Sequence, residues 1–134
     1  MAIEFQDFSV QVKGQIEDQI NVVLEECAAE LETQTKRNTR VKTGKTKNSF
    51  RHKVVKSEHT AYIGSDEENA IWEEFGTGEH ALNGDGRQGG WNYQDEKGKW
   101  HYTTGKRPSR AFWLAYTGLK DAIINHIKES FKGL

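Results

Sequence analysis

The residues of this chain that could do chemistry are its five histidines and twenty acidic residues. His80, Asp85 and His101 flank a glycine-rich stretch, and a loop that folded back would bring these three potential metal ligands together. The sequence has no HExxH motif and no pair of histidines at helical spacing. Cys27 is the only cysteine, which excludes an intrachain disulfide and a thiolate metal cage. We therefore expect neither a metal nor a cofactor.

Two further patterns are typical of enzymes but are incomplete here. Glu73 and Glu74 are adjacent carboxylates, yet neighbouring residues on a helix point about 100° apart, and general acid and base groups must converge on one substrate. The segment GDGRQGG at 84–90 is as rich in glycine as a phosphate cradle, but it lacks the GK[ST] ending. The sequence predicts a protein that is not an enzyme.

The segment EFGTG at 74–78 is more informative, and it predicts a structural corner. We expect Phe75 to be buried, and we expect Gly76 and Gly78 to adopt positive φ, which glycine tolerates. Glu74 and Thr77 have side-chain oxygens that can accept hydrogen bonds from nearby backbone N–H groups.

Charge is segregated along the chain although the net charge is only −1. Residues 36–56 carry nine bases and no acid, whereas residues 1–35 carry eight acids and one base, and residues 57–80 seven acids and no base. The basic block could pair with the chain's own carboxylates, dock on an acidic neighbour, or follow a nucleic-acid backbone. Phe50 is its only aromatic residue, which disfavours base stacking. The candidate interaction residues in the block are Arg37, Arg40, Lys42, Lys45 and Lys47.

Apolar spacing predicts a long amphipathic helix from Ser9 to about Arg37, with acidic residues opposite its apolar stripe. At 1.5 Å per residue it is about 40 Å long, so one end should project. We expect Cys27 to be a buried, unreactive thiol because it lies in that stripe. The stripe consists of Val12, Ile16, Ile20, Val23, Leu24, Cys27 and Leu31.

Strands and turns follow the first helix. FRHKVVK and TAYIGS read as a β-hairpin that turns near Ser57–His59, and ENAIWEEF reads as a short helix that ends at Gly76. Six glycines between 76 and 90 predict a mobile loop. WNYQDEKGKWHY then reads as a second hairpin with a four-residue turn. That turn sets Tyr93 opposite Trp100 and Trp91 opposite Tyr102, and these four aromatic residues are further candidate interaction residues.

A second amphipathic helix is predicted from about Pro108, the only proline, placed in its first turn. A chain of 134 residues buries roughly 68% of its unfolded surface, enough for one domain. The predicted fold is α+β: a single domain, 1–134, with a long N-terminal helix and a C-terminal helix packed on a small antiparallel β-sheet. Residues 77–104 form a flexible loop and hairpin insertion. The apolar face of the last helix comprises Phe112, Tyr116, Leu119, Ile123, Ile127 and Phe131.

The order of these motifs resembles the gene-product-ten-like tail-component family of tailed phages over roughly residues 10–130. The resemblance starts at Thr43-Gly44 with Ser49, continues through WEEFGTG at 72–78, GGWNY at 89–93, GKW at 98–100 and TG at 104–105, and ends at RPSRAF, 107–112. The EFGTG segment, together with the helix start that contains Pro108, is its most specific part.

The resemblance implies a non-enzymatic virion protein of the head–tail neck or of tail completion. Its partners would be other neck and tail proteins, and it would assemble as a homo-oligomeric ring in the virion after synthesis in the host cytoplasm. No apolar run approaches the roughly 18 residues of a membrane span, so we expect no membrane partner. The alternative function is a nucleic-acid-binding module that uses residues 36–56.

Overall fold

The computed structural model describes residues 9–41 and 44–133. Lys42 and Thr43, which the sequence marks as an interaction residue and a motif residue, lie outside the described residues. The α+β class is confirmed, with a long N-terminal helix, a C-terminal helix and small antiparallel sheets. The elements are α1 (Ser9–Asn38), α2 (Lys45–Ser49), β1 (Phe50–Val55), η1 (Lys56–Glu58), β2 (Thr60–Ser65), α3 (Glu68–Phe75), η2 (Gly78–His80), β3 (Trp91–Gln94), β4 (Trp100–Thr103) and α4 (Ala111–Ser130).

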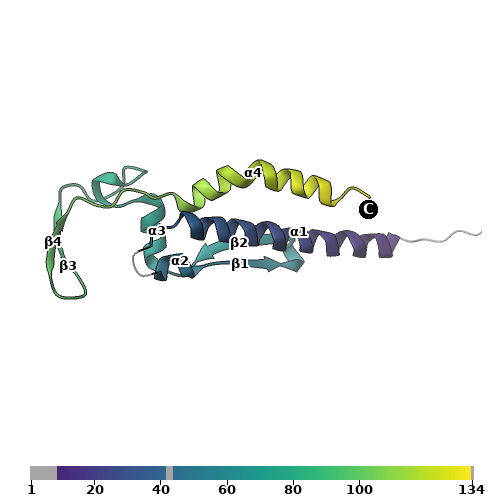
Figure 1. Ribbon diagram of the computed structural model, residues 1–134, viewed down its shortest axis with the longest axis horizontal. Helices are drawn as coiled ribbons and strands as arrows, with labels where there is room; N and C mark the ends of the chain where they lie inside the picture. Colours follow the sequence, from purple (N-terminus) through teal and green to yellow (C-terminus); the bar gives the residue numbers. More distant parts are fainter. Residues whose placement is uncertain (1–8, 42–43, 134) are drawn as a thin grey trace, which may run out of the picture.

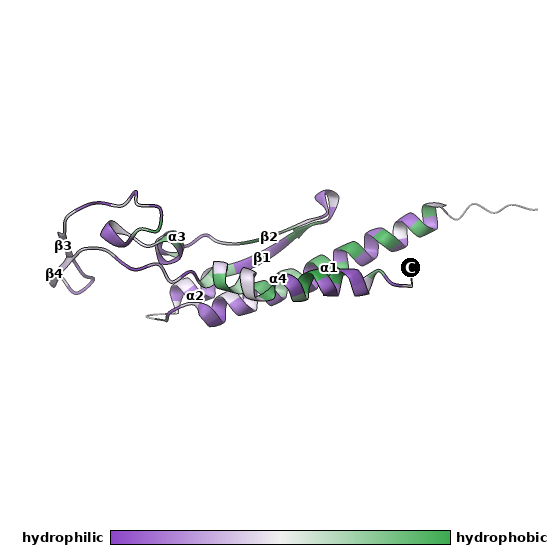
Figure 2. Cartoon of the chain, turned by 90° about the horizontal axis from the view of Figure 1, so that it is seen from above, coloured by the Kyte–Doolittle hydropathy of each residue, from purple (hydrophilic) through white to green (hydrophobic). Residues whose placement is uncertain are grey.

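Helix α1 is the central element, with α4 along one side and the β1–β2 hairpin along the other (Figure 1). The two long helices are antiparallel. Asn38 Nδ2 donates to the carbonyl oxygen of Ala111 at 3.1 Å, and Gln19 Nε2 donates to that of Ser130 at 3.0 Å. Hydrophobic residues continue along α1 to its N-terminal end, where Val12 is 46% exposed, so its apolar stripe is longer than the surface that covers it (Figure 2).

The predicted β1–β2 hairpin is present, and burial alternates along the first five residues of β1. Phe50 is buried and His52 and Val54 are half-buried, whereas Arg51 and Lys53 between them are exposed. His52 ties the hairpin to α1, because its Nε2 lies 2.5 Å from Glu25 Oε1 and its Nδ1 lies 3.3 Å from Glu32 Oε1. The hydrogen bond to Glu25 raises the pKa of His52 above its ordinary value, against the opposing effect of burial.

The hydrophobic core is small. Burial raises the pKa of the Cys27 thiol, which is buried as predicted. Among the described residues, eighteen large hydrophobic side chains are exposed, and seven apolar residues are buried. The buried residues are Val23, Cys27, Ala28, Phe50, Ala70, Ala111 and Ala115.

Helix α4 differs from the prediction at its start. It begins at Ala111 rather than at Pro108, because the N–H of Ser109 donates to the carbonyl oxygen of Glu73 and Arg110 adopts a left-handed φ of 58°. Of its predicted apolar face, Phe112, Leu119, Ile123 and Phe131 are half-buried, whereas Tyr116 and Ile127 are exposed. The most buried residues of α4 are the small Ala111 and Ala115, each next to a predicted aromatic position. Tyr116, next to Ala115, is 38% exposed.

The β3–β4 hairpin exists, but its predicted register is wrong. Tyr93 pairs with His101 and Trp91 pairs with Thr103, one residue away from the predicted partners. The Asp95 carboxylate accepts the N–H groups of Lys97 and Lys99, which holds five residues in the turn instead of four. A one-residue shift moves side chains to the opposite face. Trp91 and Tyr93 therefore face one way, and Trp100 and Tyr102 the other.

Candidate functional site

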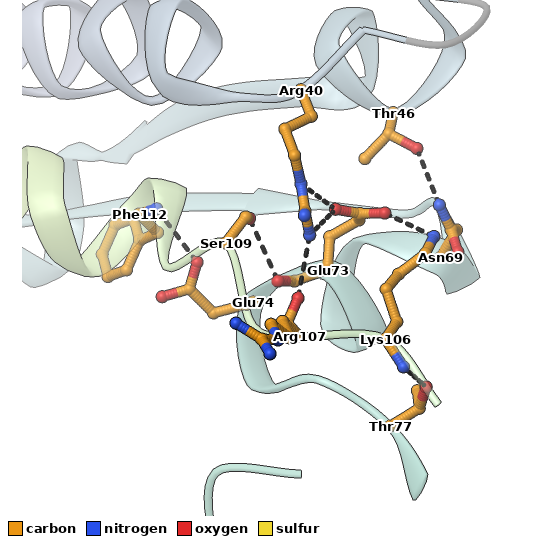
Figure 3. A network of polar contacts seen from close by, with 10 residues as sticks. All are labelled: Arg40, Thr46, Asn69, Glu73, Glu74, Thr77, Lys106, Arg107, Ser109 and Phe112. Atoms are coloured by element: carbon orange, nitrogen blue, oxygen red, sulfur yellow. Dashed lines mark hydrogen bonds and ion pairs between the residues drawn. The ribbon is translucent and has the colours of Figure 1, made fainter. Parts of the chain in front are cut away.

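The junction between α3 and the start of α4 carries a dense polar network (Figure 3). Arg40 Nη2 lies 2.9 Å from Glu73 Oε2, and Lys106 Nζ lies 2.5 Å from Glu73 Oε1. Burial would raise the pKa of the Glu73 carboxyl, but the hydrogen bonds and charges of Lys106 and Arg40 outweigh burial and lower that pKa below its ordinary value. Glu73 is thus an ionised anchor between three segments of the chain.

Glu74 has a different role, because its carboxylate caps α4. Its two oxygens each accept a backbone N–H, from Phe112 and from Trp113, both at 3.0 Å. These N–H groups belong to the second and third residues of α4, which have no partner within the helix. The side chain of Arg110, at the N-cap position, makes no capping hydrogen bond. Glu74, 36 positions earlier in the sequence, supplies the capping hydrogen bonds instead.

Segments 76–79 and 104–106 are joined by hydrogen bonds of the backbone and of the Thr77 side chain. Thr77 N–H donates to the carbonyl oxygen of Lys106 at 2.9 Å, and the N–H of Lys106 donates to Thr77 Oγ1 at the same distance. Gly76 has φ 75° and Gly78 φ 62°. A Cβ at Gly78 would overlap the carbonyl oxygen of Thr104, so only glycine permits this approach. EFGTG therefore forms a corner with a distant segment rather than with its own neighbours.

Phe75 is not buried, contrary to the prediction. Its side chain is 41% exposed because Gly76 turns the chain toward Lys106, and this turn leaves the ring at the edge of an open groove. The Arg110 guanidinium lies 5.5 Å from the centre of the Phe75 ring and 5.3 Å from that of Trp113. Phe112 and Tyr116 stack beside them, with ring centres 6.5 Å apart.

This groove, the α3–α4 groove, has a volume of about 670 Å³ and a mostly apolar wall. Ile71, Phe75 and Trp113 are 58%, 41% and 48% exposed. Apolar and aromatic side chains in a concave surface are typical of a binding site for a partner. Its lining residues are Phe50, Ser65, Asp66, Glu67, Glu68, Ala70, Ile71, Glu74, Phe75, Arg110, Phe112 and Trp113.

The comparisons with known proteins identify the family of the chain. The model of the family described as "Bacteriophage HK97-gp10, putative tail-component" matches residues 3–76, more than half of the chain. The chain belongs to this family of phage tail components. The match ends at Gly76, so Thr77, Gly78 and Pro108 lie beyond it. No curated protein and no solved structure matches the chain.

The basic block of this tail component is partly neutralised by the chain's own carboxylates. Arg40 pairs with Glu73, and Lys45 Nζ lies 3.4 Å from Glu67 Oε2. Arg37 and Lys47 form no ion pair with any residue that the structure describes. Two other bases of the block also pair, Lys36 with Glu32 and Arg51 with Asp66.

The four aromatic residues of the β3–β4 hairpin are in different environments. Tyr93 stacks on His101 with ring centres 5.3 Å apart, and the Arg87 guanidinium lies 5.2 Å from the Trp91 ring. Trp100 and Tyr102 are 66% and 68% exposed. Tyr93 is 44% exposed despite its stacking, and the Tyr102 ring lies against the backbone of Gly90.

The histidines do not converge. His80 Nε2 lies 3.4 Å from Thr104 Oγ1, while His101 Nε2 lies 2.7 Å from Asp95 Oδ2 and lowers the pKa of that carboxyl. Across residues 9–41 and 44–133, no three His, Cys, Asp or Glu side chains are grouped so that they could hold a metal ion. Within the same residues, no helix has the length and apolar character needed to cross a membrane.

The sequence reasoning missed the α3–α4 groove, although the signal was present. The start of the last helix contains three aromatic residues, Phe112, Trp113 and Tyr116, interspersed with Ala111 and Ala115. At helical spacing, the aromatic rings lie on one face of the helix and the two alanines on an adjacent face. The alanine face can then pack against the protein while the aromatic face remains exposed.

Proposed function

We propose that this tail component works at the head–tail neck, as a neck or tail-completion protein that acts without catalysis by assembling as a ring. Its partners are further copies of itself and other neck and tail proteins of the phage. It is carried in the virion and is assembled in the host cytoplasm. Its place in the tail-component family and the excess of exposed large hydrophobic residues support this proposal.

The exposed hydrophobic residues carry the proposal. Fully burying one large apolar side chain stabilises a protein by about 1.5–3 kcal/mol relative to leaving it exposed. In this chain such residues line the α3–α4 groove, the free face of α4 and the N-terminal part of α1. A chain that keeps this much apolar surface open gains further burial when partners cover it.

Deleting the gene from the phage that encodes it tests the proposal. A neck or tail-completion protein gives separate full heads and tails in electron micrographs of the lysate, whereas particles that remain joined and infectious would contradict the role. Supplying the protein in trans should restore joined particles. Size-exclusion chromatography with light scattering, on the protein alone and with the purified tail tube protein, tests for assembly directly.

The nucleic-acid alternative is less well supported. Carboxylates of the same chain already pair with Arg40, Lys45 and Arg51, which lowers the charge available to phosphates. Binding to random DNA that survives physiological salt would revive this alternative, because phosphate contacts weaken steeply as salt rises. Replacement of Arg37 and Lys47 by Ser should then abolish the binding.

A further inference from the structure

We propose that neighbouring copies of this chain join their β1–β2 hairpins edge to edge, so that β1 of one copy pairs with β2 of the next. The inference deepens the proposed ring and rests on it. Each copy offers the edge of β1 to one neighbour and the edge of β2 to the other. Head-to-tail contacts of this kind close into rings when the rotation per subunit permits. The hairpins would then form one continuous antiparallel sheet.

Both strands of the hairpin are edge strands. In the part of the chain that the structure describes, β1 and β2 pair only with each other, over six residues each. In an antiparallel pair, about half of the backbone N–H and C=O groups of each strand point away from the other strand. Across the described residues, no backbone group of 51–55 or 60–64 forms a hydrogen bond outside this pair. A row of unpaired backbone groups is a template for pairing with another chain.

The position of the hairpin leaves these edges accessible. It lies along the side of α1 that faces away from α4, and α1 covers one of its faces (Figure 1). The half-buried His52 and Val54 share the covered face with Phe50, whereas Lys53 and Tyr62 are exposed on the opposite face. Because α1 packs against a face, it forms no backbone hydrogen bond with either edge among the described residues.

The charges of the two strands favour pairing of β1 with β2 over pairing of two like strands. β1 and the residue that follows it carry only bases, Arg51, Lys53 and Lys56. β2 carries no charged residue, and the acids Glu58 and Asp66 stand near its two ends. Two β1 edges would set bases beside bases, and two antiparallel β2 edges would set acids near acids, both of which are unfavourable. Only β1 against β2 brings opposite charges together.

Two of these charges have no ion-pair partner among the described residues. Lys53 forms no ion pair with them, and neither does Glu58, whose carboxylate accepts a hydrogen bond from the Tyr62 hydroxyl at 2.9 Å. Lys53 stands opposite Tyr62 in the register of the hairpin, so both side chains are on the exposed face. If a neighbour's β2 takes the same register on the free edge of β1, a second Tyr62 lies beside Lys53 and carries Glu58 with it. The contact would thus supply each of the two charges with a partner.

Cross-linking between two marked chains tests the contact in assembled particles. Phage are grown in cells that make a Lys53→Cys chain and a Gly64→Cys chain together, and the particles are treated with a short bismaleimide. A Cβ at Gly64 meets no atom within 4 Å, and Cys27 is buried with a raised pKa, so it reacts poorly. Diagonal neighbours on paired strands are about 7–8 Å apart, within reach of the reagent. We expect covalent dimers on a denaturing gel, and a cross-linked peptide that joins residue 53 of one chain to residue 64 of another.

Each variant assembled alone should remain monomeric, because the strand beside its new cysteine carries none. Dimers from Lys53→Cys alone would place β1 beside β1 and overturn the inference. The matched control replaces Gly64→Cys by Gly118→Cys, since Gly118 of α4 is likewise exposed and open at its Cβ position. An equal yield of dimers with this control, or no dimers in particles that contain both chains, would also overturn the inference. Absence of the protein from the particles would instead refute the proposed function, and the ring contact with it.

Charge reversal gives a second readout. Lys53→Glu and Glu58→Lys should each lower phage titre roughly tenfold or more, yet change the melting temperature of the isolated protein by less than about 2 °C, because exposed charges contribute little to stability. The double variant should restore the titre, since it re-creates an opposite pair between copies. Failure of the double variant to restore the titre would count against the charge pairing and the inference.

Discussion

Replacing Glu74 should destabilise the protein more than replacing any exposed carboxylate, because this side chain caps α4. Its two oxygens accept the N–H groups of Phe112 and Trp113 at 3.0 Å, and the side chain is only 14% exposed. Arg110 Nη1 lies 3.7 Å from the same carboxylate. Loss of the carboxylate leaves two helix N–H groups and a half-buried guanidinium without their partner.

The size of the effect follows from these contacts. Removing an N-cap acceptor typically costs about 1 kcal/mol, and a negative charge at a helix N-terminus contributes about 0.5 kcal/mol more. The second hydrogen bond adds about 1 kcal/mol. Glu74→Ala should therefore lower the free energy of unfolding by about 2–3 kcal/mol, which corresponds to roughly 10 °C in melting temperature. Glu74→Gln keeps one acceptor oxygen and should lose only about 1 kcal/mol.

Thermal and urea unfolding followed by circular dichroism measures both variants at pH 7. Glu96→Ala is the matched control, since Glu96 is an exposed carboxylate in the β3–β4 turn. We expect the control to change the melting temperature by less than about 2 °C, because exposed charges contribute little. Equal stability of Glu74→Ala and Glu96→Ala would refute the capping argument. An effect of Glu74→Gln as large as that of Glu74→Ala would show that charge, not acceptor number, dominates.

Three further predictions concern other parts of the molecule. Gly78→Ala should cost at least about 2 kcal/mol more than Gly84→Ala in urea unfolding, since both have positive φ but only Gly78 abuts backbone. The raised pKa of His52 stabilises the fold below about pH 6.5, so unfolding free energy should fall from pH 6 to 8, and His52→Gln should flatten this dependence. Amide exchange should show weak protection over the β3–β4 hairpin, 91–103, in the monomer, and strong protection there would contradict a hairpin that needs a neighbour.

The elements of this fold could be predicted from the sequence because each is set by local pattern. The long helix α1 and the β1–β2 hairpin appear as expected. The register of β3–β4 could not be predicted, because it depends on how many backbone N–H groups the Asp95 carboxylate holds. The Asp95 side chain sets the length of the turn and with it the register. The alternation of residues in WNYQ and KWHY is compatible with both registers.

The junction was recognised only in part, for a physical reason. EFGTG indicates a corner, yet the partners of Glu74 lie 38 and 39 residues away, at the start of another helix. Local spacing cannot encode such a contact. The prediction that Phe75 is buried assumed that an aromatic residue at a corner belongs to the core, whereas the groove leaves it at the surface.

In this tail component, polar contacts hold the α3–α4 junction together, whereas the hydrophobic residues beside it remain exposed. Glu73, Glu74 and the backbone bonds between 76–79 and 104–106 fix the shape around α3 with hydrogen bonds and ion pairs. The aromatic residues next to them are therefore not needed to hold the junction and remain open. A subunit whose junction is fixed in this way can present a preformed groove, which lowers the conformational cost of binding a neighbour. The exposed aromatic residues beside the junction would then become buried when a neighbouring protein covers them.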